Sequence, residues 1–371
     1  MIRIPVYQPD LSGNERRYVL ECLESTWVSS KGHFIQDFEA TFAKFVGAPH
    51  ASSACNGTVA LHLALLALGI GPGDEVLVPS FTYVASVNAI QYVGATPVFC
   101  DSLPDTWQLD PADVERRITS RTRAIMAVHL YGGACDMPRY VELCERHSLK
   151  LVEDCAEAIG TRLNDRHVGT FGDIATFSFF GNKTITTGEG GMVVCNDHEL
   201  NARVRHLRGQ GLAENREYWH DIIGYNYRMT NICAAMGLAQ LERIDDILLR
   251  KSNLASAYHS LLKGCNVSLQ EATKGEISSH WMVTVLAPDK NQRDRVRAAL
   301  REHGIETRPA FHPVHTMPMY FTEAQLPVAQ DLGARGINLP SWHNLPMREV
   351  ENICKVIIDI CTPTAPADSM S

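Results

Sequence analysis

Short apolar runs alternate with helical patterns of apolar residues along the first two-thirds of the chain. The runs predict buried strands at 75–79, 96–101, 123–131, 149–154, 174–180 and 191–196. The spacing between them predicts helices at 60–68, 84–94, 111–118 and 137–148. Strands that are apolar throughout, rather than alternating, are typical of a parallel sheet with both faces covered. We therefore expect an α/β fold with a large, mostly parallel sheet flanked by helices.

The pattern changes after Asn231. One long helical pattern covers 230–262, and its single interruption is Gly237, which costs a helix interior about 1 kcal/mol relative to alanine. Beyond it we expect a strand at 278–286 and helices at 293–304 and 350–361. These elements predict two domains and a disordered tail. The large domain covers 1–245 and includes an N-terminal segment at 1–24, the small C-terminal α+β domain covers 246–362, and the tail covers 363–371.

Composition excludes several classes of partner. The net charge of −8 argues against broad binding of nucleic acid, which needs a basic surface. The longest apolar stretch, 60–70, is too short to span a bilayer. The 11 cysteines are scattered singly and form no CxxC pair, as expected in a reducing compartment. We therefore expect a cytoplasmic protein with no nucleic-acid partner, no membrane partner and no metal site.

One lysine follows an apolar run in TFSFFGNKTITTGEGG, residues 176–191. Lysine is rarely buried, so Lys183 could be a surface charge, a phosphate clamp or a nucleophile. A desolvated lysine loses its proton more readily, and the neutral amine attacks carbonyl groups. Taken alone, Lys183 is best explained as a surface charge.

Three other features bear on this lysine. The turn 56–58, Asn-Gly-Thr, opens into a buried helix whose N-terminus favours an anion, although Thr58 could be a simple helix cap. Tyr83 follows the strand at 75–79 and could stack on a planar ligand or pack in the core. Three acids gather where the strand at 149–154 ends, the place where ligand groups collect in open α/β sheets, although they could also be solvated; they are Glu153, Asp154 and Glu157.

Together these features occur in the order expected of an enzyme that uses pyridoxal 5′-phosphate (PLP). PLP requires a lysine for a Schiff base, an acid opposite the pyridine nitrogen and a cradle for its phosphate. The combination makes Lys183 a candidate nucleophile and proton carrier.

The chain resembles the sugar-nucleotide aminotransferases of the DegT/DnrJ/EryC/StrS type, which have the aspartate-aminotransferase fold (fold type I). The resemblance runs from about Pro5 to Ile360 and rests on the motifs NGTVALHLAL, PSFTYVAS, EDCAEA, GDIATFSFFGNKTITTGEGG, YNYRMTN and GINLP. The blocks SFFGNKTITTGEGGM and ETRPAFHPVHTMPMY resemble most closely the members that aminate GDP-4-keto-6-deoxy-D-mannose with L-glutamate for O-antigen (lipopolysaccharide) biosynthesis.

The alternatives within this resemblance are a 3- or 4-aminotransferase of a dTDP- or UDP-keto sugar and a PLP-binding regulator without activity. The related dehydratases carry histidine in place of the lysine, so Lys183 argues against them. No residue taken by itself specifies the nucleotide or the sugar.

The resemblance also implies roles for single residues. Lys183 would form the Schiff base and move protons, and Asp154 would pair with the pyridinium nitrogen. Glu157 would lie beside the cofactor ring, and Tyr83 would stack on it. The residues implied around the phosphate are Asn56, Gly57, Thr58 and Ser178.

Asn226 would reach the phosphate of the cofactor in a neighbouring subunit. The resemblance therefore implies a homodimer with shared active sites, alone or paired into a tetramer. Arg228 and Arg308 would contact substrate phosphates or the donor carboxylate, and His312 would contact the substrate. His312 and His315 form an HxxH pattern, for which substrate contact or packing is a better interpretation than a metal site.

Overall fold

The centre of the fold is a seven-stranded sheet with the order β1-β9-β8-β5-β4-β2-β3. The computed structural model describes residues 2–362, so the expected disorder of 363–371 lies outside the described residues. The seven strands are β1 (His50–Ala54), β2 (Glu75–Pro79), β3 (Thr96–Cys100), β4 (Thr122–Val128), β5 (Lys150–Asp154), β8 (Ile174–Ser178) and β9 (Gly191–Cys195). Five of the six predicted strands run parallel to one another, as expected of an α/β fold.

Two strands depart from the sequence-based expectation. β9 was predicted as a strand but runs antiparallel to both β8 and β1. The segment between β8 and β9 contains no helix, and a parallel return requires a longer crossover. β1 was not predicted because its sequence, HASSA, is small and polar, although four of its five residues are buried.

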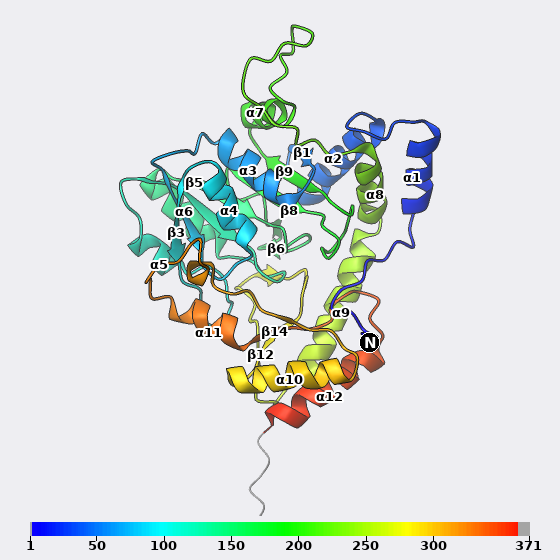
Figure 1. The fold of residues 1–371 in the computed structure, drawn as a ribbon, viewed down its shortest axis with the longest axis vertical. Helices are drawn as coiled ribbons and strands as arrows, with labels where there is room; N and C mark the ends of the chain where they lie inside the picture. The colour runs from blue at the N-terminus through cyan, green and yellow to red at the C-terminus, as the bar shows by residue number, and fades with distance from the viewer. Residues whose placement is uncertain (1, 363–371) are drawn as a thin grey trace, which may run out of the picture.

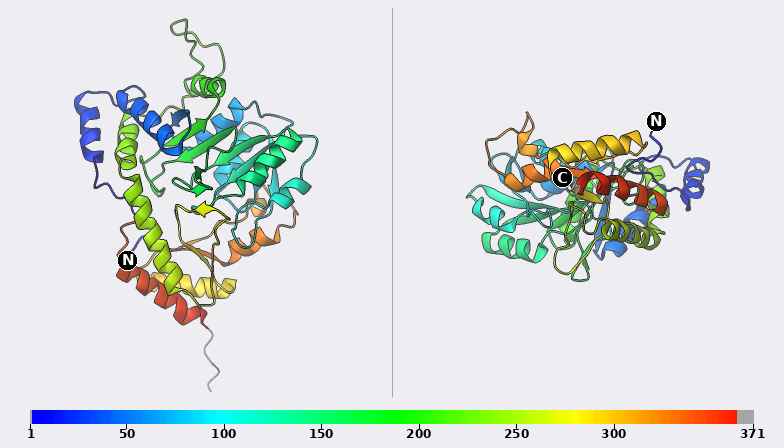
Figure 2. Two further views of the ribbon diagram at one scale, coloured as in Figure 1. Left: turned by 180° about the vertical axis from the view of Figure 1, so that it is seen from behind. Right: turned by 90° about the horizontal axis from the view of Figure 1, so that it is seen from below.

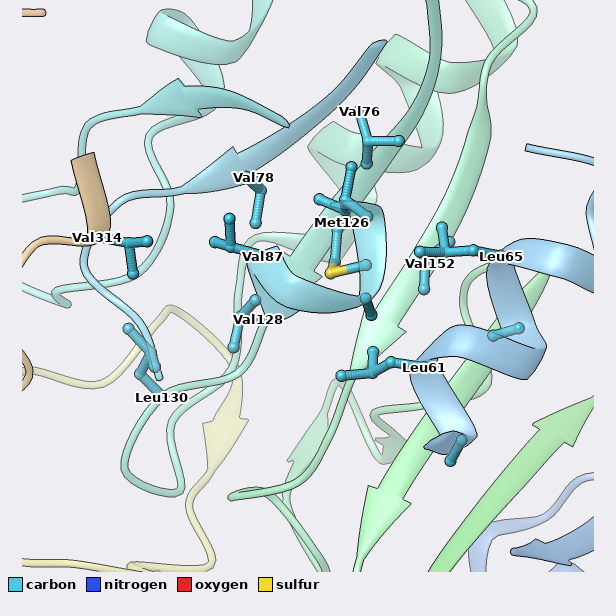
Figure 3. Packing of buried hydrophobic residues seen from close by; sticks show 14 of the residues in the cluster. Leu61, Leu65, Val76, Val78, Val87, Met126, Val128, Leu130, Val152 and Val314 are labelled. Carbon is cyan, nitrogen blue, oxygen red and sulfur yellow. The ribbon is translucent and has the colours of Figure 1, made fainter. Parts of the chain in front are cut away.

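Helices cover both faces of the sheet (Figures 1 and 2). On one face, α3 (Gly57–Ala67) and α4 (Val84–Tyr92) pack on β2, β4 and β5 through side chains such as Leu61, Val87 and Met126, drawn in Figure 3. The remaining helices of this region are α1 (Glu15–Glu24), α2 (His33–Val46), α5 (Pro111–Arg116), α6 (Met137–His147), α7 (His198–Arg208) and α8 (Asn231–Leu241). A second apolar cluster joins α2, α6 and α8 to the sheet.

The C-terminal region has its own apolar cluster, centred on Tyr258, Val285 and Ile353. Its four-stranded sheet has the order β10-β12-β14-β13, with β10 (Ser268–Leu269), β12 (Thr284–Leu286), β13 (Arg308–Pro309) and β14 (Gly336–Asn338). Its helices are α9 (Ile244–Leu261), α10 (Lys290–Glu302), η1 (Val314–Thr316), α11 (Pro327–Arg335) and α12 (Met347–Cys361). A small third sheet contains β6 (Arg162–Leu163), β7 (Arg166–His167) and β11 (Glu276–Ile277).

The predicted helix at 230–262 is two helices, α8 and α9. The chain breaks at Glu242 and Arg243, and Gly237 lies inside α8 without interrupting it. A Cβ atom on Gly237 would lie 2.6 Å from Phe38 Cζ, so this glycine serves the close packing of α8 on α2. The prediction that Gly237 interrupts the pattern was therefore wrong.

The predicted strand at 278–286 is also shorter than expected, because only residues 284–286 pair in a sheet. His280 has a left-handed backbone with φ of 48°, which takes the chain out of strand geometry before Trp281. The proposed domain division at residue 245 falls in the first turn of α9 and stays a prediction. Within residues 2–362, no helix combines the length and the apolar character that crossing a bilayer requires.

Candidate active site

The candidate site lies where the parallel strands of the central sheet end. Tyr83 follows β2, Asp154 is the last residue of β5, and Ser178 is the last residue of β8. Lys183 lies five residues beyond Ser178 in the loop before β9. Because parallel strands end at the same edge, the fold brings together residues that are far apart in the sequence.

Lys183 is a buried amine beside a carboxylate. Its side chain is 13% exposed, and its Nζ lies 3.8 Å from Glu157 Oε1 and 4.2 Å from the centre of the Trp281 ring. Burial lowers the pKa of this amine, while the charges of Glu157 and Asp154 act in the opposite direction. Lys183 is therefore held where it can lose and regain a proton, as a nucleophilic or proton-carrying amine must.

Glu157 is the carboxyl group nearest to that amine. Its Oε2 accepts a hydrogen bond from the N–H of Tyr131 at 2.9 Å, which fixes the Glu157 side chain beside Lys183. Burial raises the pKa of Glu157 to about 7, although the nearby Lys183 favours the charged form. A carboxyl group with such a pKa can hold a proton near neutral pH.

Asp154 is held by two hydrogen bonds that leave further acceptor capacity on its oxygens. Ser86 Oγ donates to Oδ2 at 2.7 Å, and the N–H of Ala156 donates to Oδ1 at 3.1 Å. Ser86 lies in the first turn of α4, directly after the segment that carries Tyr83. The side chain of Asp154 is buried, and its charge acts on both Lys183 and Glu157.

Glu153 has a different role from its neighbour. Its carboxylate accepts three backbone N–H groups of the loop before β8, all at 2.7 Å, from Gly169, Phe171 and Gly172. His129 Nε2 lies 3.2 Å from the same carboxylate. Since successive side chains of a strand point to opposite faces, Glu153 anchors this loop and Asp154 faces the site.

The turn at the start of α3 presents backbone N–H groups, which are the groups that bind anions at helix N-termini. Asn56 caps the helix, because its Oδ1 accepts the N–H of Val59 at 3.0 Å. Among the described residues, the N–H groups of Gly57 and Thr58 donate to no protein acceptor. A Cβ atom on Gly57 would lie 2.8 Å from Ser178 Cβ and 3.0 Å from Ser178 Oγ, so the serine lies against this turn. The helix cap is Asn56 and not Thr58, which leaves the N–H groups free for a ligand.

One of the glycines after Lys183, Gly191, allows close packing against the turn at 56–58. A Cβ atom on Gly191 would lie 2.4 Å from the carbonyl oxygen of Asn56. Any larger residue at 191 would therefore push β9 away from the turn at 56–58.

Tyr83 differs from a core residue in that 60% of its surface is exposed, and its ring lies 6.0 Å from that of Phe311. Its ring is thus available to a planar ligand.

Asn226 and Arg228 lie at the base of the segment that follows α7. The N–H of Cys55 donates to the carbonyl of Tyr227 at 2.8 Å, so this segment passes beside the turn at 56–58. Asn226 is exposed, and its Oδ1 lies 3.5 Å from Arg228 Nη2. That Asn226 reaches a neighbouring subunit stays a prediction.

The other predicted substrate residues lie on the segment from β13 to η1. Arg308 is half-exposed, with its Nε 3.5 Å from Glu306 Oε1, and His312 is exposed. His315 is buried, and its Nδ1 lies 2.6 Å from Oγ of Ser80, the residue that follows β2. His315 is therefore a packing residue that seats this segment across the carboxyl end of the sheet, whereas substrate contacts of Arg308 and His312 stay predictions.

Comparison with known proteins assigns this geometry to a family. The model of the DegT/DnrJ/EryC1/StrS aminotransferase family matches residues 9–358. The chain belongs to this family. It is 57% identical to a GDP-perosamine synthase of Escherichia coli O157:H7 over 95% of this chain and 97% of that protein. It is 50% identical to a GDP-perosamine synthase of Vibrio cholerae over 95% of this chain and 98% of that protein.

Solved structures of this family share the whole fold. A candidate sugar aminotransferase of Streptococcus pneumoniae in its PLP form matches with a TM-score of 0.92 and 28% identity, over 96% of this chain and 98% of that chain. The aminotransferase fold type I predicted from the sequence is therefore confirmed, and PLP is the cofactor of the family.

The residues of this family member fit PLP. The free N–H groups of Gly57 and Thr58, together with the Ser178 hydroxyl, suit the phosphate, and a Cβ atom at 57 would fill that space. Asp154 offers a buried carboxylate to a pyridine nitrogen, and Lys183 offers an amine at the same edge of the sheet.

Three residues of the site were not singled out from the sequence. Ser86 lies in the quoted motif PSFTYVAS, and its position one helical turn after Tyr83 was the available signal. Trp281 Nε1 donates to the carbonyl of Asn182 at 2.7 Å, but the prediction of a strand at 278–286 hid it. Tyr7 donates its hydroxyl to the carbonyl of Lys183, a tertiary contact with no local signal.

Proposed function

We propose that this protein is a GDP-perosamine synthase. It transfers the amino group of L-glutamate to the 4-keto group of GDP-4-keto-6-deoxy-D-mannose and releases 2-oxoglutarate. The sugar substrate is supported by the 57% identity to the E. coli enzyme over 95% of the chain. The observation that carries aminotransfer is the buried amine of Lys183, which lies 3.8 Å from Glu157 and shares the sheet edge with Asp154.

The chain supplies binding and proton transfer in this reaction. PLP, when bound, accepts the electron pair released at the carbon that loses its proton. The N–H groups of Gly57 and Thr58 bind its phosphate, and Asp154 keeps its ring nitrogen protonated. Lys183 Nζ would take the proton from Cα of L-glutamate and deliver it to the cofactor carbon that holds the amino nitrogen, and it would carry a proton the opposite way when the sugar is aminated. Glu157 keeps the amine in place and holds a proton close to it.

We also propose that the active enzyme is a homodimer with shared sites. The segment after α7 projects from the body of the protein, at the top of Figure 1. It carries apolar side chains into solvent, and Tyr218 and Ile223 are 96% and 88% exposed. Such side chains mark a protein contact. The neighbouring Asn226 would then complete the phosphate site of the partner subunit.

Mixing two impaired variants tests the shared site. Lys183→Ala and Asn226→Ala should each be weakly active alone. In a mixed dimer, one site combines the intact Lys183 of one subunit with the intact Asn226 of the other, so activity should return. If affinity tags show that the two kinds of subunit form mixed dimers and the activity does not rise, the result would argue against sites shared between subunits. If two dimers pair into a tetramer, sedimentation should give twice the mass of the dimer.

The free cysteines bear on the compartment. All 11 are unpaired, and free thiols are the rule where glutathione keeps proteins reduced. We therefore place the proposed reaction in the cytoplasm.

The substrate is tested by parallel assays. The purified enzyme with PLP and L-glutamate receives the 4-keto-6-deoxy sugars of GDP, dTDP and UDP at equal concentration, and the amino sugars are identified by mass spectrometry. Amination of the GDP sugar at the highest kcat/KM is expected. Amination of only a dTDP or UDP sugar would refute the GDP assignment, and a lack of turnover despite PLP binding would favour a regulator.

A further inference from the structure

Lys251 is a second buried lysine, and the proposed reaction does not use it. It lies in the middle of α9 and is 1% exposed. Its Nζ donates to two backbone carbonyls, that of Trp281 at 3.0 Å and that of Ser341 at 2.8 Å. Within residues 2–362 it forms no ion pair with a carboxylate. Burying an ammonium group without an opposite charge is costly, so the residue requires an explanation.

The groups around Lys251 are adjacent to Lys183. The Trp281 ring lies 4.2 Å from Lys183 Nζ, and its Nε1 donates to Asn182 at 2.7 Å. The ring of Tyr7, whose hydroxyl donates to the Lys183 carbonyl, has its centre 5.7 Å from Lys251 Nζ. Lys251 thus contacts two aromatic residues that each contact the Lys183 segment directly.

The backbone at Trp281 needs such an anchor. It follows His280, whose φ of 48° is unusual for a residue with a side chain. The chain pairs in a sheet only from Thr284 onward, so the carbonyl of Trp281 has no strand partner there. Without Lys251, a buried carbonyl would lose its donor, and such a loss destabilises the local conformation.

The second carbonyl bound by Lys251 belongs to Ser341, which also holds the N-terminal segment. The N–H of Ser341 donates to the carbonyl of Val6 at 3.2 Å, and the Ser341 hydroxyl accepts the N–H of Val283 at 2.8 Å. The residue beside Val6 is Tyr7. The amine of Lys251 therefore holds the two segments that bring Trp281 and Tyr7 to the site.

We propose that Lys251 is a positioning residue, which holds the indole of Trp281 against the amine of Lys183 by binding the Trp281 carbonyl. The proposal rests on the proposed role of Lys183 as the reacting amine. A hydrocarbon side chain could fill the same volume but could not donate to either carbonyl. The other ionisable groups near Lys251 are His280, His343 and the hydroxyl of Tyr7, and none of them can replace a donor to both carbonyls.

The first test measures Lys183 without cofactor. In protein freed of PLP, the rate at which an amine-acylating reagent modifies Lys183 is followed by mass spectrometry. Lys251→Met should raise this rate at least about 5-fold, because Trp281 no longer covers the amine. Lys263→Met, which removes an exposed lysine just beyond α9, is the control and should leave the rate unchanged. A rate within 2-fold of wild type in Lys251→Met would overturn the proposal.

The second test asks whether the effect passes through Trp281. The rate of the half-reaction with L-glutamate should fall about 10- to 100-fold in Lys251→Met, as small misplacements of reacting groups do, while the Kd for glutamate changes less than 2-fold. Trp281→Ala should show a similar loss, and adding Lys251→Met to it should change little. Losses that multiply in the double variant would contradict a path through Trp281.

Two controls keep the outcomes separate. PLP should protect Lys183 of the wild-type protein from acylation; a lack of protection would count against the proposed function and not against Lys251 alone. If Lys251→Met gives no folded protein by circular dichroism, Lys251→Leu, which also lacks an N–H donor, takes its place. An acylation rate close to that of Trp281→Ala is expected for it, and a wild-type rate would overturn the proposal.

Discussion

The phosphate cradle is most directly tested by adding one methyl group at residue 57. In Gly57→Ala, the new Cβ atom would lie 2.8 Å from Ser178 Cβ and 3.0 Å from Ser178 Oγ. Carbon atoms pack best at about 3.5–4.0 Å, and Ser178 is the last residue of a central strand, so it cannot move far. Overpacking of this kind costs about 1–3 kcal/mol, whereas alanine gains about 0.5–1 kcal/mol over glycine in a helix.

The clash is larger than the helical gain, so the free energy of unfolding should fall by about 1–2 kcal/mol. The methyl group also enters the space in front of the free N–H groups, and the Kd for PLP should rise at least about 10-fold, which corresponds to about 1.4 kcal/mol. The assay is a titration of the PLP-free protein followed by visible absorbance, with thermal unfolding in parallel. Gly71→Ala, where the nearest atom to the new Cβ is 3.8 Å away, is the control. A Kd for Gly57→Ala within 2-fold of wild type would refute the cradle at 56–58.

Three further changes test the other parts of the site. Lys183→Ala should still bind PLP without a covalent bond but lose turnover by at least about 10³-fold; borohydride reduction should no longer attach the cofactor to the protein, and near-normal turnover would disprove its role. For Glu157, the folded pKa of about 7 exceeds the unfolded value of 4.5, so its contribution to the stability of the PLP-free protein is full below pH 4.5 and is lost as the pH rises through 7. Glu157→Gln should therefore lose less stability than wild type between pH 5 and 8, by roughly 1–3 kcal/mol in urea unfolding; equal slopes would contradict a raised pKa. Ser86→Ala removes the 2.7 Å hydrogen bond to Asp154 and should weaken PLP binding about 10-fold. Ser120→Ala, at an exposed serine, is the control and should not change PLP binding. An unchanged Kd for PLP in Ser86→Ala would mean that Asp154 keeps its position without the serine.

The sequence predicts most of the central sheet and the chemical groups at its edge. Residues 76–79 are all apolar, and this local signal is enough to place β2 and, with it, Tyr83. Asp154 ends one such run and Lys183 follows another, so their shared location follows from the rule that parallel strands end together. The orientation of β9 does not follow, because an apolar run carries no information about direction.

The surroundings of Lys183 could not be predicted in the same way. Trp281 and Tyr7 reach the lysine segment across 99 and 176 residues of sequence, and no periodicity relates them. The break between α8 and α9 was missed because Glu242 and Arg243 are both compatible with a helix. Gly237 was misinterpreted for a related reason, since its use lies in a contact with Phe38 that only the packed structure shows.

The pairing of β1 with β9 also has a consequence for how the protein matures during synthesis. β1 leads directly into the turn at 56–58, yet its partner β9 follows 137 residues later, as the pair Ala54 and Gly191 shows. At a translation rate of about 5–20 residues per second, the ribosome needs roughly 7–27 s to supply that partner. During this interval the very apolar helix α3 emerges before the strands β8 and β9 that cover it. We expect the nascent chain to depend on chaperones in this period, and to acquire its cofactor only after β9 has left the ribosome.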